Sequence, residues 1–402
     1  MAEQYSNQAK TTLASGIDES TNTVTLTDAS KFPSTGLFTI VCEDELMLVV
    51  SRSGSTLTVE RGSESTTAAP HVAGQNVAHV LSKRSMAALL RQATMPNGFP
   101  FPSEVAITWS DATRTLTVSP TGTMFTVVCN GVVYNRVSGG SVQIPNTTGN
   151  WAIYYDNDCV LTASQTSWDF LSHAIVASIY WDSANAKATT VGYELHGTCE
   201  TGQPMDDYTH LFLHNAVGAC YRSGLALGHN AIASGNPNTD NRNTQISVQA
   251  GEVLDEDIRI IITNGTGSSR WEQDLGTYPF PATAPASADV AKLPVLYKAG
   301  PNATSYWVKA AATNWPFPFT AGNIPQWNQN NAGTWRLTQM SNNNAFVVWL
   351  FACNDIFDPV VALIGEGDYT DVATAAAATT PSTIFSSRSG APGAEYRLLY
   401  RL

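Results

Sequence analysis

The chain has 402 residues, enough for two to four compact domains with sizeable hydrophobic cores. Charged residues make up only 13% of it, against roughly 25% in a typical globular protein, so its polar surface must consist mainly of Ser, Thr, Asn and Gln. The formal net charge of −12 argues against nucleic-acid binding, because too few cations are present to neutralise phosphates.

The N-terminal residues lack a basic stretch followed by an apolar run, so we expect no signal peptide. No segment approaches the roughly 18 apolar residues of a membrane-spanning helix. We therefore expect synthesis in a cytoplasm without export. The cysteines are scattered, with no CxxC pair, which predicts buried free thiols rather than a disulfide framework; they are Cys42, Cys129, Cys159, Cys199, Cys220 and Cys353.

Residues 1–82 are predicted to form a small β module. Residues 23–27, 38–42, 46–51 and 56–59 have the alternation or apolar character of strands, and residues 52–55 form a turn signal. Asp44 and Glu45 form an acidic pair that could serve acid/base catalysis or bind a metal, but a polar hairpin tip is the commoner role for such a pair.

The same module resembles a small N-terminal attachment domain of tailed-phage virion proteins. The matching residues are Phe32 to Ile40, Glu45 before an apolar run, Thr58 to Gly62, and Ser65 to Gly74. They cover about the first fifth of the chain and recur in one order. The resemblance implies that this module docks the protein onto a virion.

Residues 83–103 are predicted to be a helix and a Pro-rich linker. Ser85 can cap a helix on which Met86, Leu89 and Leu90 share one face. The prolines from Pro96 onward cannot continue a regular element, so we expect a domain boundary there.

Residues 104–195 are predicted to form a β-sandwich-like domain. Asn130 and Gly131 separate two apolar runs and give the strongest hairpin signal in the chain. Residues 151–161 predict a second hairpin, and residues 173–181 a long apolar strand. His173, at the start of that strand, is expected to be a structural residue.

Residues 196–244 are a His/Gly-rich central segment for which we weigh three hypotheses. His210 and His214 are four apart and would share a helix face, so with His196 or Cys199 they could bind a metal. Ser223 or Cys220 could be a nucleophile, although the GxSxG elbow is lacking. Alternatively, the histidines and Asp206 or Asp207 form a buried hydrogen-bond network that locks an irregular loop.

The segment from Glu194 to Gly228 carries a second resemblance. Its ordered EXHG, MD, TH, LH, G, Y and SGL elements are similar to a string in tail-fibre and other virion structural proteins of tailed phages, where a DEDI-like segment follows. This chain has DEDI at Asp255 to Ile258 and departs from the string at Cys199 to Gly202. The resemblance assigns no role to the histidines.

Residues 245–402 are predicted to form a C-terminal β domain with a short Ala-rich helix at 371–379 and a final strand that pairs in the last sheet. The acidic run 255–257 could hold Ca²⁺, but it lacks EF-hand spacing and is better explained as a solvated turn. The Trp- and Asn-rich loops of this domain could stack on sugars or merely pack. The receptor-binding candidates are Trp315, Trp327, Asn328, Asn330 and Trp335.

Taken together, these patterns predict a mainly β, non-enzymatic protein without a cofactor. We expect a virion structural component, most simply a homotrimeric tail fibre or tail-tip protein that contacts other virion proteins and a host surface glycan or envelope receptor, without entering a membrane. Two alternatives stay open: a head fibre or capsid decoration protein, and a metal-dependent depolymerase.

Overall fold

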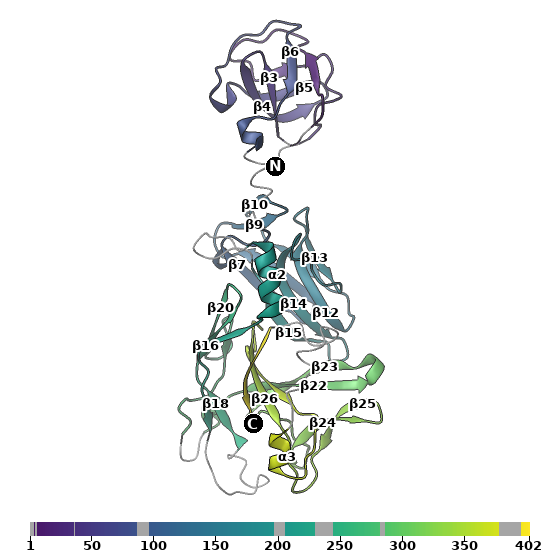
Figure 1. Ribbon diagram of the computed structural model, residues 1–402, viewed down its shortest axis with the longest axis vertical. Coiled ribbons are helices and arrows are strands. Elements are labelled where there is room, and N and C mark those ends of the chain that lie inside the picture. The colour runs from purple at the N-terminus through teal and green to yellow at the C-terminus, as the bar shows by residue number, and fades with distance from the viewer. Residues whose placement is uncertain are drawn as a thin grey trace. The chain divides into compact units, whose positions relative to one another are not determined.

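A computed structural model describes the whole chain except residues 1–3, 5, 36, 87–95, 197–205, 230–243, 282–285 and 378–394. Strands account for 48% of the chain and helices for 9%, which confirms the mainly β class. The chain divides into two compact units, Met1–Met95 and Pro96–Leu402 (Figure 1).

The first unit is built on one antiparallel sheet with the strand order β1-β6-β3-β4-β5-β2. Its core is made by alternate residues of neighbouring strands, such as Phe38, Ile40, Met47 and Leu57, all of them fully buried. The predicted strands of this module are confirmed. The strands are β1 (Lys10–Thr12), β2 (Thr23–Thr25), β3 (Phe38–Cys42), β4 (Glu45–Ser53), β5 (Thr56–Glu60) and β6 (Asn76–His79).

The acidic pair at the start of β4 lies in two environments, since Asp44 is exposed and Glu45 is buried. We predicted a polar hairpin tip, and for Glu45 this is wrong, because its side chain is only 1% exposed. Its two oxygens accept hydrogen bonds from Arg61 Nε and Nη2 at 2.7 and 2.8 Å and from the backbone N–H of Gly62 at 2.9 Å. His71 Nε2 lies 2.8 Å from the same carboxylate.

This network brings together the residues that define the N-terminal sequence motif. Burial, the largest influence, raises the pKa of Glu45, but the bonds from Arg61 and Gly62 outweigh it and lower that pKa to about 2. Glu45 therefore stays ionised and ties β4 to the segments that follow β5.

The second unit begins with β-hairpins and a four-stranded sheet. Asn130 and Gly131 both have positive φ (50° and 71°), as a type I′ turn requires, so the strongest hairpin prediction is confirmed. The second hairpin and the long apolar strand are confirmed as β12–β13 and β14. The strands are β7 (Val105–Ser110), β8 (Thr115–Pro120), β9 (Phe125–Cys129), β10 (Val132–Arg136), β11 (Gly140–Gln143), β12 (Gly149–Tyr155), β13 (Leu161–Ser164), β14 (Ala174–Asp182) and β15 (Lys187–Tyr193).

In its described residues, the rest of the second unit holds two α-helices and three further sheets. The largest sheet has the order β24-β25-β22-β27-β26-β28, with β23 beside β22. The final strand pairs with β26, as predicted. The elements are α2 (Asp207–Ala216), α3 (Val372–Ala376), β16 (Cys220–Gly224), β17 (Leu227–His229), β18 (Ile246–Val248), β19 (Gly251–Asp255), β20 (Ile258–Asn264), β21 (Glu272–Gln273), β22 (Leu293–Pro301), β23 (Tyr306–Thr313), β24 (Gln326–Asn331), β25 (Thr334–Gln339), β26 (Val348–Cys353), β27 (Val360–Ile364) and β28 (Tyr396–Arg401).

One large cluster of buried hydrophobic residues crosses the boundary that we placed between two β domains. Ile179 of β14, Ile260 of β20 and Leu350 of β26 belong to the same buried cluster. All nine residues of β14 are buried, because both faces of its sheet are covered. Residues 104–195 and 245–402 therefore lie in the same compact unit, Pro96–Leu402.

The first residues of the second unit are also packed, although we predicted a linker there. Phe99 is fully buried in the core, and Gly98 forms a β-bridge with Val128. Asn97 donates from its backbone N and from Nδ2 to the two oxygens of Asp207, each at 3.1 Å. The helix predicted after Ser85 falls mainly on residues 87–95, outside the described part, while residues 83–86 are helical.

Candidate metal centre

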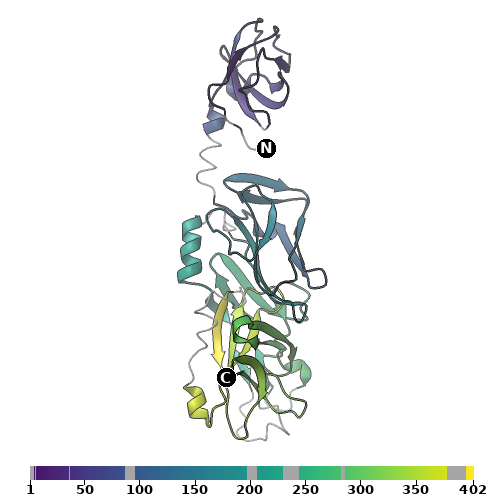
Figure 2. The same ribbon diagram turned by 90° about the vertical axis from the view of Figure 1, so that its right-hand side faces the viewer.

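The three histidines of the central segment meet in the second unit. His196 follows β15, and its backbone carbonyl accepts a hydrogen bond from the N–H of Phe99 at 3.1 Å. His210 and His214 lie one turn apart on α2, which borders the sheets of this unit (Figure 2). The same spacing turns Tyr208 and Phe212 of α2 toward solvent.

The helix starts where it does because Asp206 caps it. The Asp206 carboxylate accepts hydrogen bonds from the backbone N–H groups of Tyr208 and Thr209, at 3.1 and 3.0 Å. Among the described residues, neither carboxylate bonds a histidine ring, and Asp206 meets His210 only through the helix backbone, where the His210 N–H donates to the Asp206 carbonyl oxygen at 3.0 Å. The predicted network therefore had the wrong acidic side chains. Burial raises the pKa of Asp207 to about 6, against the two bonds from Asn97.

The acidic partners of the histidines come instead from the DEDI segment and from Glu395. Asp255 ends β19, and the Glu256–Asp257 turn leads into β20. We predicted a solvated turn, but Asp255 is fully buried and the Glu256 side chain is only 1% exposed. The turn points inward because α2 and His196 cover it.

One ring nitrogen of His196, Nδ1, is hydrogen-bonded, whereas among the described residues the other, Nε2, has no hydrogen-bond partner. Its Nδ1 lies 2.6 Å from Oδ1 of Asp257, the length of a strong charge-assisted hydrogen bond. Its Nε2 lies 3.3 Å from Oε2 of Glu256 and 3.4 Å from Oε2 of Glu194, without hydrogen-bond geometry to either among the described residues.

The two helix histidines face the same glutamate. His210 Nε2 lies 3.4 Å from Oε2 of Glu256, and His214 Nδ1 lies 3.2 Å from Oε1 of Glu256 and from Oε1 of Glu395. Within the described part of the chain, these imidazole nitrogens and both Glu256 oxygens have no hydrogen-bond partner. The ring of Phe170 packs against both histidines, with centroids 4.9 and 4.8 Å away.

Burial and neighbouring charges separate the pKa values in this cluster. Burial lowers the pKa of His210, whereas for His196 the carboxylates of Asp257 and Glu194 outweigh burial and raise the pKa well above 6.5. Burial raises the pKa of Glu395 to about 7, despite His214. For Glu256 the histidines outweigh burial and lower its pKa.

A second layer of polar groups fixes the acids in place. Asn354 Nδ2 donates to Oδ2 of Asp255 at 2.9 Å and to Oε1 of Glu194 at 3.1 Å. Ser178 Oγ donates to the same Glu194 oxygen at 3.1 Å. Sequence reasoning missed Asn354, whose only local signal is its place after a very apolar strand.

Three groups in this cluster have donor atoms close enough to share a cation: His196, His210 and Glu256; Glu194, His196 and Asp255; and His214, Glu256 and Glu395. All three predicted metal-ligating histidines therefore fall in candidate groups, each beside a carboxylate. Cys199 lies outside the described residues. Cys220 belongs to none of these groups, and its Sγ lies 3.6 Å from the carbonyl oxygen of Gly218.

The receptor-binding candidates divide into buried and accessible residues. Trp327 is 9% exposed and Asn328 2%, and Asn328 bonds both backbone groups of Lys298. These two pack the β24–β25 hairpin and are not available to a receptor. Trp315 and Trp335 are half-buried, and Asn330 is exposed.

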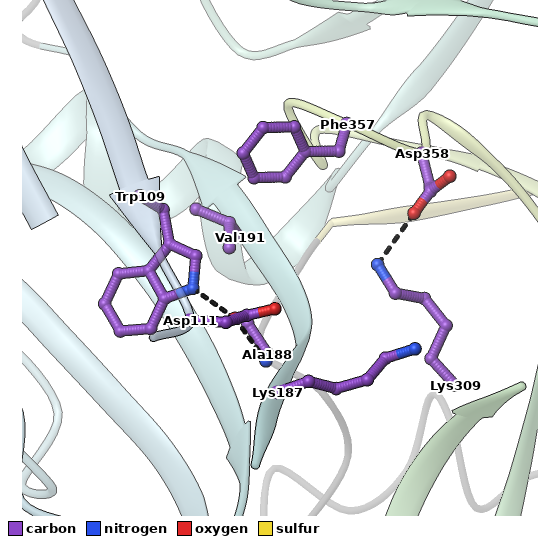
Figure 3. A pocket seen from close by; sticks show the side chains of 8 residues that line it. All are labelled: Trp109, Asp111, Lys187, Ala188, Val191, Lys309, Phe357 and Asp358. Atoms are coloured by element: carbon purple, nitrogen blue, oxygen red, sulfur yellow. Dashed lines mark hydrogen bonds and ion pairs between the residues drawn. The ribbon is translucent and has the colours of Figure 1, made fainter. Parts of the chain in front are cut away.

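A pocket of about 340 Å³ lies among β7, β15, β23 and the segment before β27 (Figure 3). Lys309 Nζ donates to Oδ2 of Asp358 at 2.7 Å, and Asp111 accepts from Trp109 Nε1 at 2.6 Å. Burial lowers the pKa of Lys309, but Asp355 and Asp358 outweigh it and raise that pKa. The pocket contains no residue of the histidine cluster.

Comparison with models of known protein families gave no match, and a search of curated proteins gave no relative. In the part of the chain that the structure describes, no helix has the length and apolar character needed to cross a membrane.

Proposed function

We propose that this protein is a structural subunit of a tailed-phage particle, a tail fibre or tail-tip protein. Its first unit attaches to the virion, and its second unit carries the surface that meets the host. The observation that supports this most directly is the Glu45 network. Glu45, Arg61, Gly62 and His71, which come from three separate parts of the attachment-domain motif, meet at one buried carboxylate.

The Glu45 network supports the resemblance to the attachment domain because it gives a physical reason for these residue types to recur in one order. A buried carboxylate needs a guanidinium and backbone donors to remain charged inside a small β unit. The motif therefore acts as the internal framework of the module, as expected for a docking domain whose outer surface varies with its partner.

The burial of the histidine cluster favours a structural role over catalysis. The side chains of His196, His210 and Glu256 are 1%, 5% and 1% exposed, so a polymer substrate has no direct access to them. This favours a virion component over the alternative of a metal-dependent depolymerase.

We further propose that the protein acts as a homotrimer. Tyr208 and Phe212 on α2 are 71% and 64% exposed, and Val217 and Tyr221 just after it are 50% and 51% exposed. Exposed side chains of this size, with Tyr208 and Phe212 one turn apart on α2, are typical of a protein contact, which we propose is with further copies of the chain. Three copies would multiply weak receptor contacts through avidity.

Immunogold labelling of virions with an antibody against this chain tests the proposal. Gold at the tail tip or fibres is the expected result, and gold on the capsid supports the head-fibre alternative instead. Virions without label, together with release of sugars from host polysaccharide by the purified chain, would overturn the structural proposal.

A further inference from the structure

We infer that His196, His210 and Glu256 bind one divalent transition-metal ion, of the zinc class, which joins three segments of the second unit. The ligand atoms are Nε2 of each histidine and Oε2 of Glu256. They come from the segment that follows β15, from α2 and from the turn between β19 and β20. The inference does not depend on the virion proposal.

The separations between these atoms fit a shared ion better than direct hydrogen bonds. With metal–ligand bonds of about 2.05 Å, two ligand atoms of a tetrahedral zinc site lie about 3.3 to 3.4 Å apart. The observed values are 3.3 Å for His196 Nε2 to Glu256 Oε2 and 3.4 Å for His210 Nε2 to the same oxygen. A charge-assisted N–H···O bond would be about 2.7 to 2.9 Å long.

The lack of hydrogen-bond partners for the candidate ligand atoms leads to the same conclusion. His196, His210 and Glu256 are almost completely buried, yet among the described residues the two Nε2 atoms and both glutamate oxygens lack hydrogen-bond partners. Buried polar atoms are nearly always satisfied, because an unsatisfied one costs about 1 to 3 kcal/mol. One cation between them satisfies all three ligands at once.

Asp257 supplies the outer partner that metal-binding histidines usually have. Its carboxylate lies 2.6 Å from Nδ1 of His196, which directs Nε2 toward Glu256 and makes it a better ligand. Glu194 Oε2 also lies 3.4 Å from His196 Nε2, but Glu194 belongs to a separate candidate group, with His196 and Asp255. A set of two imidazoles and a carboxylate suits Zn²⁺ and its neighbours better than Ca²⁺ or Mg²⁺.

The test uses the full-length chain, freed of metal with a chelator and then titrated with Zn²⁺ by calorimetry and with Co²⁺ by visible absorption. We expect one equivalent to bind and Co²⁺ to give the intense absorption of a tetrahedral site. A folded wild-type chain that binds neither ion would overturn the inference.

Two variants and one control test the assignment of the ligands. Asp257→Asn should weaken Zn²⁺ binding about 10- to 100-fold, and His210→Gln should weaken it more. The matched control is His173→Gln, because His173 stacks on Tyr154 at 4.0 Å, apart from the candidate ligands, and should leave the affinity unchanged. Near-UV circular dichroism checks that each variant is folded. Wild-type affinity in a folded His210→Gln chain would contradict the assignment.

Discussion

Nε2 of His196 lies 3.3 Å from Oε2 of Glu256, and both side chains are 1% exposed. This contact connects the end of β15 to the turn between β19 and β20 inside the second unit. Glu256 also faces His210 and His214, and among the residues that the structure describes it is the one acid that all three histidines share.

Replacing Glu256 by Gln should therefore destabilise the second unit strongly. Removing one partner of a buried ionic group leaves the other charges uncompensated, which costs about 3 to 5 kcal/mol. The expected result is a lower urea midpoint, measured by near-UV circular dichroism. Glu252→Gln on β19, the strand that precedes Glu256, is the control, since Glu252 pairs with Arg222 and Arg259 at the surface and its loss should not shift the midpoint measurably. Equal effects of the two variants would contradict the shared role of Glu256.

The first unit should respond in the same way to loss of Glu45. Glu45→Gln leaves the Arg61 guanidinium, 5% exposed, without its charged partner, and we expect a loss of about 3 kcal/mol. Hydrogen exchange of peptides from residues 38–60 in the full chain reports this loss. Glu43→Gln is the matched control because Glu43 meets the same His71 but is 50% exposed. An unchanged exchange rate in Glu45→Gln would show that the network does not stabilise the unit.

Acid should weaken the first unit through the same carboxylate. The pKa of Glu45 in the folded protein is about 2, below the value of about 4.3 in an unfolded chain. A lowered pKa means that the unfolded chain binds the proton more readily, so this stabilisation is complete above about pH 4.3 and is lost as the pH falls toward 2. Pepsin cleavage within residues 38–60 should rise over that interval in the wild-type chain. In Glu45→Gln this dependence should be much flatter.

A structural feature of this protein could be predicted from the sequence where neighbouring residues alone determine it. The Asn130–Gly131 turn needs only positive φ at two neighbouring residues, and the alternation along β5 needs only one buried face, so both were predictable. By contrast, the acidic turn at Glu256 has the composition of a solvated loop and becomes buried only because α2 packs over it. Glu395 carries no local signal at all.

The extent of the second compact unit, Pro96–Leu402, was hard to predict for a related reason. A long apolar run such as β14 fits a strand of a separate sandwich as well as a strand covered on both faces by other parts of the chain. Only contacts far apart in sequence, such as the hydrogen bond from the Trp307 N–H to Tyr180 Oη at 3.0 Å, distinguish the two arrangements.

Two of the buried thiols should be convertible to a disulfide. Sγ of Cys129 lies 2.7 Å from Sγ of Cys159, and both residues are buried. Oxidised glutathione should join them by thiol–disulfide exchange, in which the chain loses two hydrogen atoms and two molecules of reduced glutathione form. Mass spectrometry of peptides without reduction should detect the linked pair after partial unfolding admits the reagent. Cys353, buried elsewhere with its Sγ 3.6 Å from the carbonyl oxygen of Asp358, should remain a thiol. Detection of Cys129 only as a free or glutathione-bound residue would contradict the pairing.

The exposed face of α2 should decide the oligomeric state. Phe212, 64% exposed, lies one turn from Tyr208, 71% exposed, and helix α2 between Asp207 and Ala216 carries no Lys or Arg to solvate that face. If copies of the chain cover it, Phe212→Ser should convert a trimer of about three times 43.0 kDa into monomers by light scattering, without lowering the urea midpoint of the monomer. Val133→Ser, at a position 43% exposed on β10, is the control and should leave the trimer intact. A wild-type chain that is monomeric at micromolar concentration would contradict the trimer, and receptor binding would then have to rest on the affinity of a single copy.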